Sequence, residues 1–178
     1  MLMQTCISRL RSPAGARAFS LMEILIVVVI LGILAAIAVP KLSNASHVAR
    51  ENTLKDDLRF LRTQIIVFHS QHQEVYPAYP AGNLAQTPTE ADFVAQMTQF
   101  TDDQCNVSAS VSAVCKWGPY LTQMPDNPIN SLHTIKILAD SDSLTADNTT
   151  GWLYKPSTGE IAPNLIGSDS VGKAFSSY

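Results

Sequence analysis

The sequence of 178 residues predicts an α+β fold in which one long N-terminal helix packs on a small antiparallel β-sheet. Three observations predict this fold. An uninterrupted apolar run ends at Val39, a heptad-like apolar stripe follows it, and short alternating apolar segments lie near the C-terminal end. The first half of the helix is expected to span a membrane, and the second half to be amphipathic and to carry the sheet.

The apolar run in residues 19–40 predicts a transmembrane helix. As a helix, residues 19–39 would measure about 31 Å, which matches a hydrocarbon core of about 30 Å. The leader before it, residues 1–18, holds three arginines and no acid, while every acid of the chain except Glu23 lies beyond Val39. This charge asymmetry predicts a cytoplasmic N-terminus and an exported remainder.

A second apolar pattern follows Pro40 and predicts an amphipathic helical extension in residues 41–73. Pro40 removes one backbone hydrogen bond, so a kink is expected there. The apolar positions of the extension recur at spacings of three and four residues, as expected for a buried helical stripe. They are Leu54, Leu58, Leu61, Ile65 and Phe68.

Residues 74–178 are predicted to form a globular head. Thr87, Pro88 and Glu90 form a capping signature that predicts the start of a short helix at Pro88. Residues 133–140 are predicted to form a strand and residues 151–164 a hairpin. The tail beyond residue 164 is rich in Ser and Gly, which predicts loose order.

The head contains two cysteines, and a third, Cys6, lies in the leader. In an oxidising compartment Cys105 and Cys115 are expected to form a disulfide. Two buried free thiols are the alternative. His69 and His72 lie one helical turn apart, a spacing that permits a metal, although a position on the helix surface is the simpler interpretation.

A single acid, Glu23, stands at the start of the apolar run. A carboxylate at the centre of a membrane helix costs about 2.5–3.5 kcal/mol on insertion scales. A plain anchor gains nothing from such a residue, so Glu23 is expected to have a partner.

The junction from Ala18 through Phe19 to Glu23, between a basic leader and an apolar helix, resembles the signature of type IV pilin-like proteins. That family includes pilins and the pseudopilins of type II secretion. The resemblance implies that a prepilin peptidase cuts between Ala18 and Phe19, and that the new amine of Phe19 is methylated. The family usually has Gly before the cut, where this chain has Ala18. Glu23, Gly32 and Pro40 fall where such proteins carry residues used in assembly.

The resemblance implies a structural subunit and not an enzyme. The subunit would polymerise with itself into a helical filament, with Glu23 of one copy beside the Phe19 ammonium of its neighbour. Other implied partners are the peptidase and methylase, an inner-membrane assembly platform, minor pseudopilins, and the bacterial inner membrane before assembly. From there the subunit would move into a periplasmic or extracellular filament. The acidic head has no basic patch in its sequence, which argues against nucleic acid as the main partner.

Residues 124–130 with residues 151–161 look like the C-terminal part of pseudopilin-like proteins and favour the secretion branch. A major or minor type IV pilus pilin is the alternative within the family. From another class, a membrane-tethered periplasmic binding domain remains open. So does a cleaved signal peptide, because Ala36-Ile37-Ala38 has the form that a signal peptidase recognises.

Asp140, Asp142 and Asp147 are weak candidates for a calcium site. Their spacing does not fit the EF-hand loop, so a solvated acidic loop is the favoured interpretation. Calcium is the one cofactor that the sequence suggests.

Overall fold

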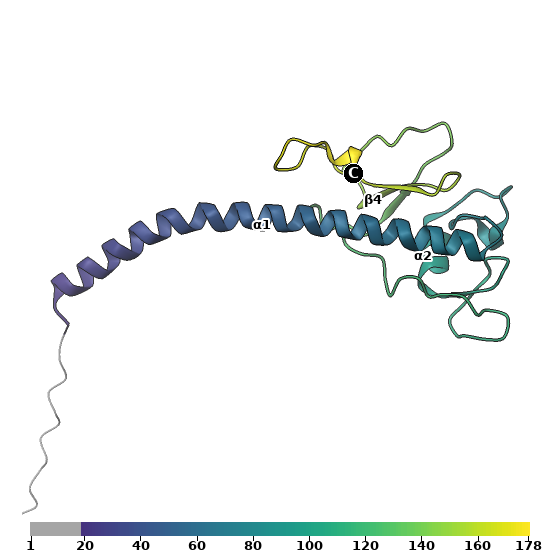
Figure 1. Cartoon of the computed structure of the whole chain (residues 1–178), viewed down its shortest axis with the longest axis horizontal. Coiled ribbons are helices and arrows are strands. Elements are labelled where there is room, and N and C mark those ends of the chain that lie inside the picture. The colour runs from purple at the N-terminus through teal and green to yellow at the C-terminus, as the bar shows by residue number, and fades with distance from the viewer. Residues whose placement is uncertain (1–18) are drawn as a thin grey trace, which may run out of the picture. The chain divides into compact units, whose positions relative to one another are not determined.

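The computed structural model describes residues 19–178. They fall into two compact units, the first ending at Ser43 and the second comprising Asn44–Tyr178. Helix α1 (Leu21–Gln71) supplies the described part of the first unit and the first element of the second (Figure 1). The prediction of a helix from the apolar run to the end of the amphipathic extension is therefore confirmed.

The second unit is built on the apolar stripe of α1. The five predicted stripe residues are each at most 1% exposed, and they form one core cluster with side chains of the sheet and of a second helix. Trp152, Tyr154 and Ile161 come from the sheet, and Phe93 and Met97 from helix α2 (Glu90–Thr98). Burying each such side chain contributes about 1.5–3 kcal/mol, which explains why the stripe fixes the position of the sheet on α1.

The remaining elements of the second unit are short (Figure 1). They are the 3₁₀ helix η1 (Pro80–Gly82), strands β1 (Phe100–Thr101) and β2 (Val107–Ser108), strands β3 (Ile135–Ile137), β4 (Trp152–Lys155) and β5 (Glu160–Pro163), and the 3₁₀ helix η2 (Phe175–Ser177). Strands β1 and β2 form an antiparallel pair, and the other three strands form a separate sheet in the order β3-β4-β5.

The three-stranded sheet is mixed, which corrects the expectation of an antiparallel sheet. The hairpin β4-β5 is antiparallel, as predicted, with Lys155 opposite Glu160. Strand β3, however, runs parallel to β4, with Ile135 opposite Trp152. The long segment 138–151 makes this arrangement possible, because it returns the chain to the end at which β3 began.

Helix α2 begins two residues later than its capping signature suggested. The N-cap is Thr89, whose hydroxyl oxygen accepts a hydrogen bond of 3.0 Å from the Asp92 N–H. Glu90 is the first residue of the helix, and its carboxylate accepts a hydrogen bond of 2.8 Å from the Ile135 N–H of β3. Glu90 therefore joins α2 to the sheet instead of closing a capping box with Thr87.

The C-terminal tail is held on α1, which corrects the prediction of loose order. Both carboxylate oxygens of Glu51 accept hydrogen bonds from Ser170, at 2.9 Å from its N–H and 2.6 Å from its hydroxyl. The Lys55 ammonium lies 3.6 Å from Asp169, and Arg62 donates a hydrogen bond of 2.6 Å to the Tyr178 carbonyl. Three charged side chains of α1 thus hold the tail at Ser170, Asp169 and Tyr178.

Candidate assembly site

The first turn of α1 is capped by Ser20. Its hydroxyl oxygen accepts a hydrogen bond of 3.1 Å from the Glu23 N–H, and its carbonyl accepts a second bond from the same group. Glu23 thus stands at the third helical position, where the positive end of the helix dipole favours an acid. The cap was not predicted, although the Ser-x-x-Glu spacing of a capping box was its signal in the sequence.

The apolar half of α1 is exposed on every side. Each residue from 19 to 39 is exposed, with Leu21 at 86% and Val27 at 47% among the large apolar side chains. A helix that is apolar all round is stable only in lipid or against other protein. Within the described residues, α1 is the one helix that is long and apolar enough to span a membrane, and a signal sequence would have the same properties.

The predicted assembly and processing residues share this region. Phe19 is 73% exposed ahead of the helix, while Ala18 and the rest of the leader lie outside the described residues. Gly32 and Pro40 both lie within α1. A methyl group added at Gly32 would meet no atom within 4 Å, so the space beside this residue is open.

The architecture is consistent with that of a pilin-like protein. A long helix begins with an apolar half, and its amphipathic half packs against a small sheet in an α+β unit. Comparison with models of known protein families, with curated proteins and with solved structures found no match for the chain.

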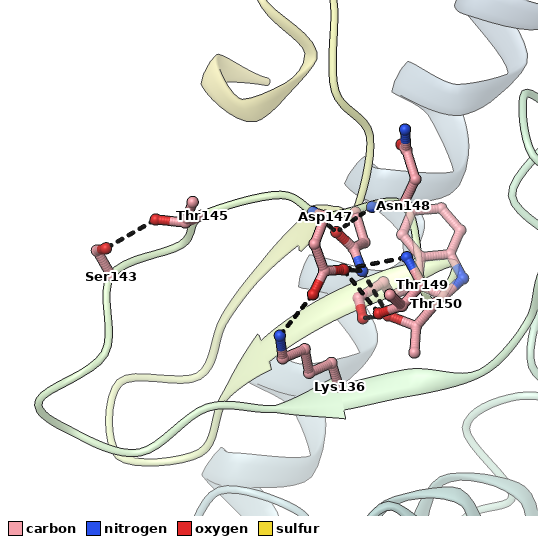
Figure 2. Close-up of polar contacts among 9 residues, drawn as sticks. Lys136, Ser143, Thr145, Asp147, Asn148, Thr149 and Thr150 are labelled. Atoms are coloured by element: carbon pink, nitrogen blue, oxygen red, sulfur yellow. Dashed lines mark hydrogen bonds and ion pairs between the residues drawn. The ribbon is translucent and has the colours of Figure 1, made fainter.

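The three calcium candidates are not brought together into a site. The Asp147 carboxylate faces the Lys136 ammonium at 2.7 Å (Figure 2), and it also accepts hydrogen bonds from Thr149 and Asn164. The bond from Lys136 and then those from Thr149 and Asn164 lower the pKa of Asp147 well below its usual value. Among residues 19–178, no group of three His, Cys, Asp or Glu side chains gathers as metal ligands do.

The loop that carries these aspartates is instead fixed to the sheet. Asn164, which is fully buried at the end of β5, accepts hydrogen bonds from the N–H groups of Asp147 and Asn148, at 2.7 and 3.2 Å. Its amide donates to the Thr150 hydroxyl at 2.8 Å. Asp142 accepts a bond of 3.2 Å from the Ala139 N–H within the same loop. The sequence did not indicate the role of Asn164, because a buried amide has no distinguishing spacing.

His69, in the last turn of α1, and His72, just beyond its end, have separate environments. His72 is fully buried and not on the helix surface: its Nδ1 lies 2.7 Å from the Phe68 carbonyl, and its Nε2 lies 2.9 Å from the Thr101 hydroxyl. His69 stacks on Tyr76 with ring centroids 4.0 Å apart. Both ring nitrogens of His72 are thus occupied by protein groups, so the pair does not form a metal site.

The predicted disulfide is not formed in the structure. Cys105 and Cys115 are both free, the first buried in the core cluster and the second half-buried. The Cys105 side chain faces Gly82, where an added Cβ would lie 3.2 Å from its sulfur. Cys115 belongs to a separate turn, in which its N–H donates a bond of 2.9 Å to the Ser112 hydroxyl. The Cys105 side chain packs in the core, away from the turn of Cys115, which explains why no disulfide is formed.

The two thiols are expected to differ in reactivity. Burial, and then the nearby charge of Asp102, raise the pKa of Cys105 to about 12. Because the thiolate is the reactive form, alkylation of Cys105 at pH 8 should be at least about 100-fold slower than that of Cys115. Peptide mapping after timed treatment of the native chain with iodoacetamide measures both rates, and a denatured sample should lose the difference. Resistance of both cysteines until a reductant is added would contradict the free thiols.

Proposed function

We propose that the chain is a structural subunit of a pilus-like filament, of the pseudopilin kind that serves type II secretion. The observation that supports this proposal is the apolar half of α1, which is exposed on every side and carries one acid in its first turn. Lipid of the bacterial inner membrane would cover this surface before assembly, and the helices of other subunits would cover it afterwards. The chain would catalyse no reaction itself, and a prepilin peptidase, a methylase and an assembly platform would act on it.

The role of Glu23 distinguishes a filament subunit from a membrane-tethered domain. After a cut before Phe19, stacking of two copies with an axial offset would place Glu23 of one beside the Phe19 ammonium of the other. In a medium of low dielectric such a pair interacts far more strongly than at a surface. Correct assembly would then relieve the penalty that the acid imposes in lipid.

The Glu23→Gln variant tests this role with little change in shape. The Glu23 group bonded to Ser20 is the backbone N–H, so the substitution leaves that helix-capping bond in place and removes only the charge. We expect normal membrane insertion and at least about a tenfold loss of filaments, measured by shearing, pelleting and electron microscopy. Ser20→Ala is the matched control, since it weakens the cap but keeps the charge. Normal filaments from Glu23→Gln would contradict the assigned role.

The N-terminus of the protein recovered from cells tests the proposal as a whole. Intact mass and N-terminal sequencing should give a chain that begins at Phe19 and carries one added methyl group. A chain beginning at Val39 would show removal of a signal peptide. A chain that retains Met1 would show a membrane tether. Either of these outcomes would overturn the filament proposal.

A further inference from the structure

An apolar and acidic patch lies at the end of the second unit where α1 terminates. Val111 and Val114 are each 65% exposed on the loop after β2. Val114 lines a groove together with Gln73, which lies just beyond the last residue of α1, and with Asp102 and Asp103. The Asp103 carboxylate forms an ion pair with the Lys116 ammonium at 3.4 Å. Asp102 bonds to Asn106 and to backbone N–H groups, and it forms no ion pair with any described residue. We call Asp102, Asp103, Val111 and Val114 the acidic patch.

An apolar and basic patch lies on the tail. Ile166 is 64% exposed and Val171 is 83% exposed, the highest value among the exposed large apolar side chains of the second unit. The Lys173 ammonium lies 5.0 Å from the centroid of the Tyr178 ring, and Lys55 lies 4.9 Å from the same centroid. Lys55 pairs with Asp169, whereas Lys173 has no carboxylate partner among residues 19–178. We call Lys55, Ile166, Val171 and Lys173 the basic patch.

The two patches are held at different levels along α1. The basic patch meets the helix at Lys55 and the acidic patch at its C-terminal end, next to Gln73. The 1.5 Å rise of a helix places Lys55 and the last residue of α1, Gln71, about 24 Å apart. The acidic patch of one copy therefore cannot contact the basic patch of the same copy, but it is free to contact that of another. Exposed apolar side chains with a charged rim are typical of a protein interface.

We propose that the acidic patch of one copy docks on the basic patch of the next copy along the filament. Val111 and Val114 would pack on Ile166 and Val171, and Asp102 would pair with Lys173. The contact joins two different surfaces, so it repeats without closing and generates an open chain of copies. This inference rests on the proposed filament function. It identifies the surfaces of the head that would join one copy to the next along the filament.

A charge exchange in the full-length chain tests the pairing. Asp102→Lys and Lys173→Glu should each lower the pelleted polymer at least about tenfold, because each places like charges together, and the double variant should restore it. Glu160→Lys and Lys155→Glu are matched reversals outside both patches and should assemble as the unaltered chain does. Assembly of both single variants at the level of these controls, or failure of the double variant to recover, would overturn the contact.

Cysteine crosslinking tests the direction of the contact. Val111→Cys combined with Val171→Cys, in a Cys115→Ser background, should give a ladder of dimers, trimers and larger species after mild oxidation. Val111→Cys alone and Val171→Cys alone, in the same background, should each give none, because the remaining Cys105 of the head is buried, and a mixture of the two variants should give dimers only. Dimers from either variant alone, or no ladder from the pair while the chain still forms filaments, would overturn the head-to-tail order. Absence of filaments from the unaltered chain would instead refute the proposed function.

Discussion

Replacement of Gly151 by alanine is expected to destabilise the second unit by about 2–4 kcal/mol. The added Cβ would overlap the carbonyl oxygen of Leu132, a backbone atom that cannot rotate away. The backbone of Gly151 is also fixed from both sides. Its N–H donates to Thr134 at 3.0 Å, and its carbonyl accepts from the Asn164 N–H at 3.0 Å and from the Asn127 amide at 2.9 Å. The clash can therefore be relieved only by breaking the start of β4.

Chemical denaturation of the full-length chain in detergent, followed by circular dichroism, measures the loss. Gly32→Ala is the matched control, because a Cβ at that position meets nothing within 4 Å and lies in a helix, where alanine is favoured. The control should leave the unfolding of the second unit unchanged. A Gly151→Ala midpoint that equals that of the control would contradict the close approach of residues 132 and 151.

The long helix and its buried stripe were predictable because they depend on local spacing. Leu54, Leu58 and Leu61 recur with the period of a helix face, and no distant partner is needed to recognise them. The direction of β3 was not predictable in this way, since it depends on the path of the loop between residues 138 and 151. The start of α2 was misplaced because two threonines, Thr87 and Thr89, lie close enough to compete as the N-cap.

In the tail and the candidate site, too, features with a local sequence signal were predictable, and features that depend on distant contacts were not. Glu23 was recognisable because an acid in an apolar run is conspicuous whatever the fold. The contact of Ser170 with Glu51 joins residues 119 positions apart, and no local sequence pattern indicates it. The burial of Asn164 and the core position of Cys105 likewise depend on the packing of segments distant in sequence. Sequence reasoning therefore found the helix surface that we assign to assembly, but not the head patches that we infer from the structure.

Substitution of His72 by alanine is expected to destabilise the second unit by about 2–4 kcal/mol, with an effect that depends on pH. The ring is fully buried between α1 and β1 and stacks on Phe68 with centroids 3.8 Å apart. Its removal would leave a cavity and deprive the Thr101 hydroxyl of its partner at 2.9 Å. His69→Ala, in the last turn of α1, is the matched control, because that ring is only partly buried.

The pH dependence distinguishes the histidine from a purely apolar core residue. Burial lowers the pKa of His72 below its ordinary value of 6.5, against smaller opposing contributions from the Phe68 carbonyl and from the charges of Asp102 and Asp103. The unfolded chain therefore binds more protons than the folded chain between the lowered pKa and 6.5. Stability that is complete above pH 6.5 should decline as the pH falls through this interval.

Titration of the aspartates near His72 does not contribute to the change in stability over this pH interval. Desolvation raises the pKa of Asp102, but the hydrogen bonds from Asn106 and Gln104 together outweigh it and lower that pKa below 3.8. The hydrogen bond from Trp117 lowers the pKa of Asp103 in the same direction, so both carboxylates remain ionised between pH 5 and 7.5. Denaturation midpoints at several values in that range should fall with acidification for the unaltered chain. The His72→Phe variant keeps an aromatic ring on Phe68 but cannot titrate, so its slope should be markedly smaller. An equal slope in this variant would mean that another group is responsible and that His72 is not held neutral in the core.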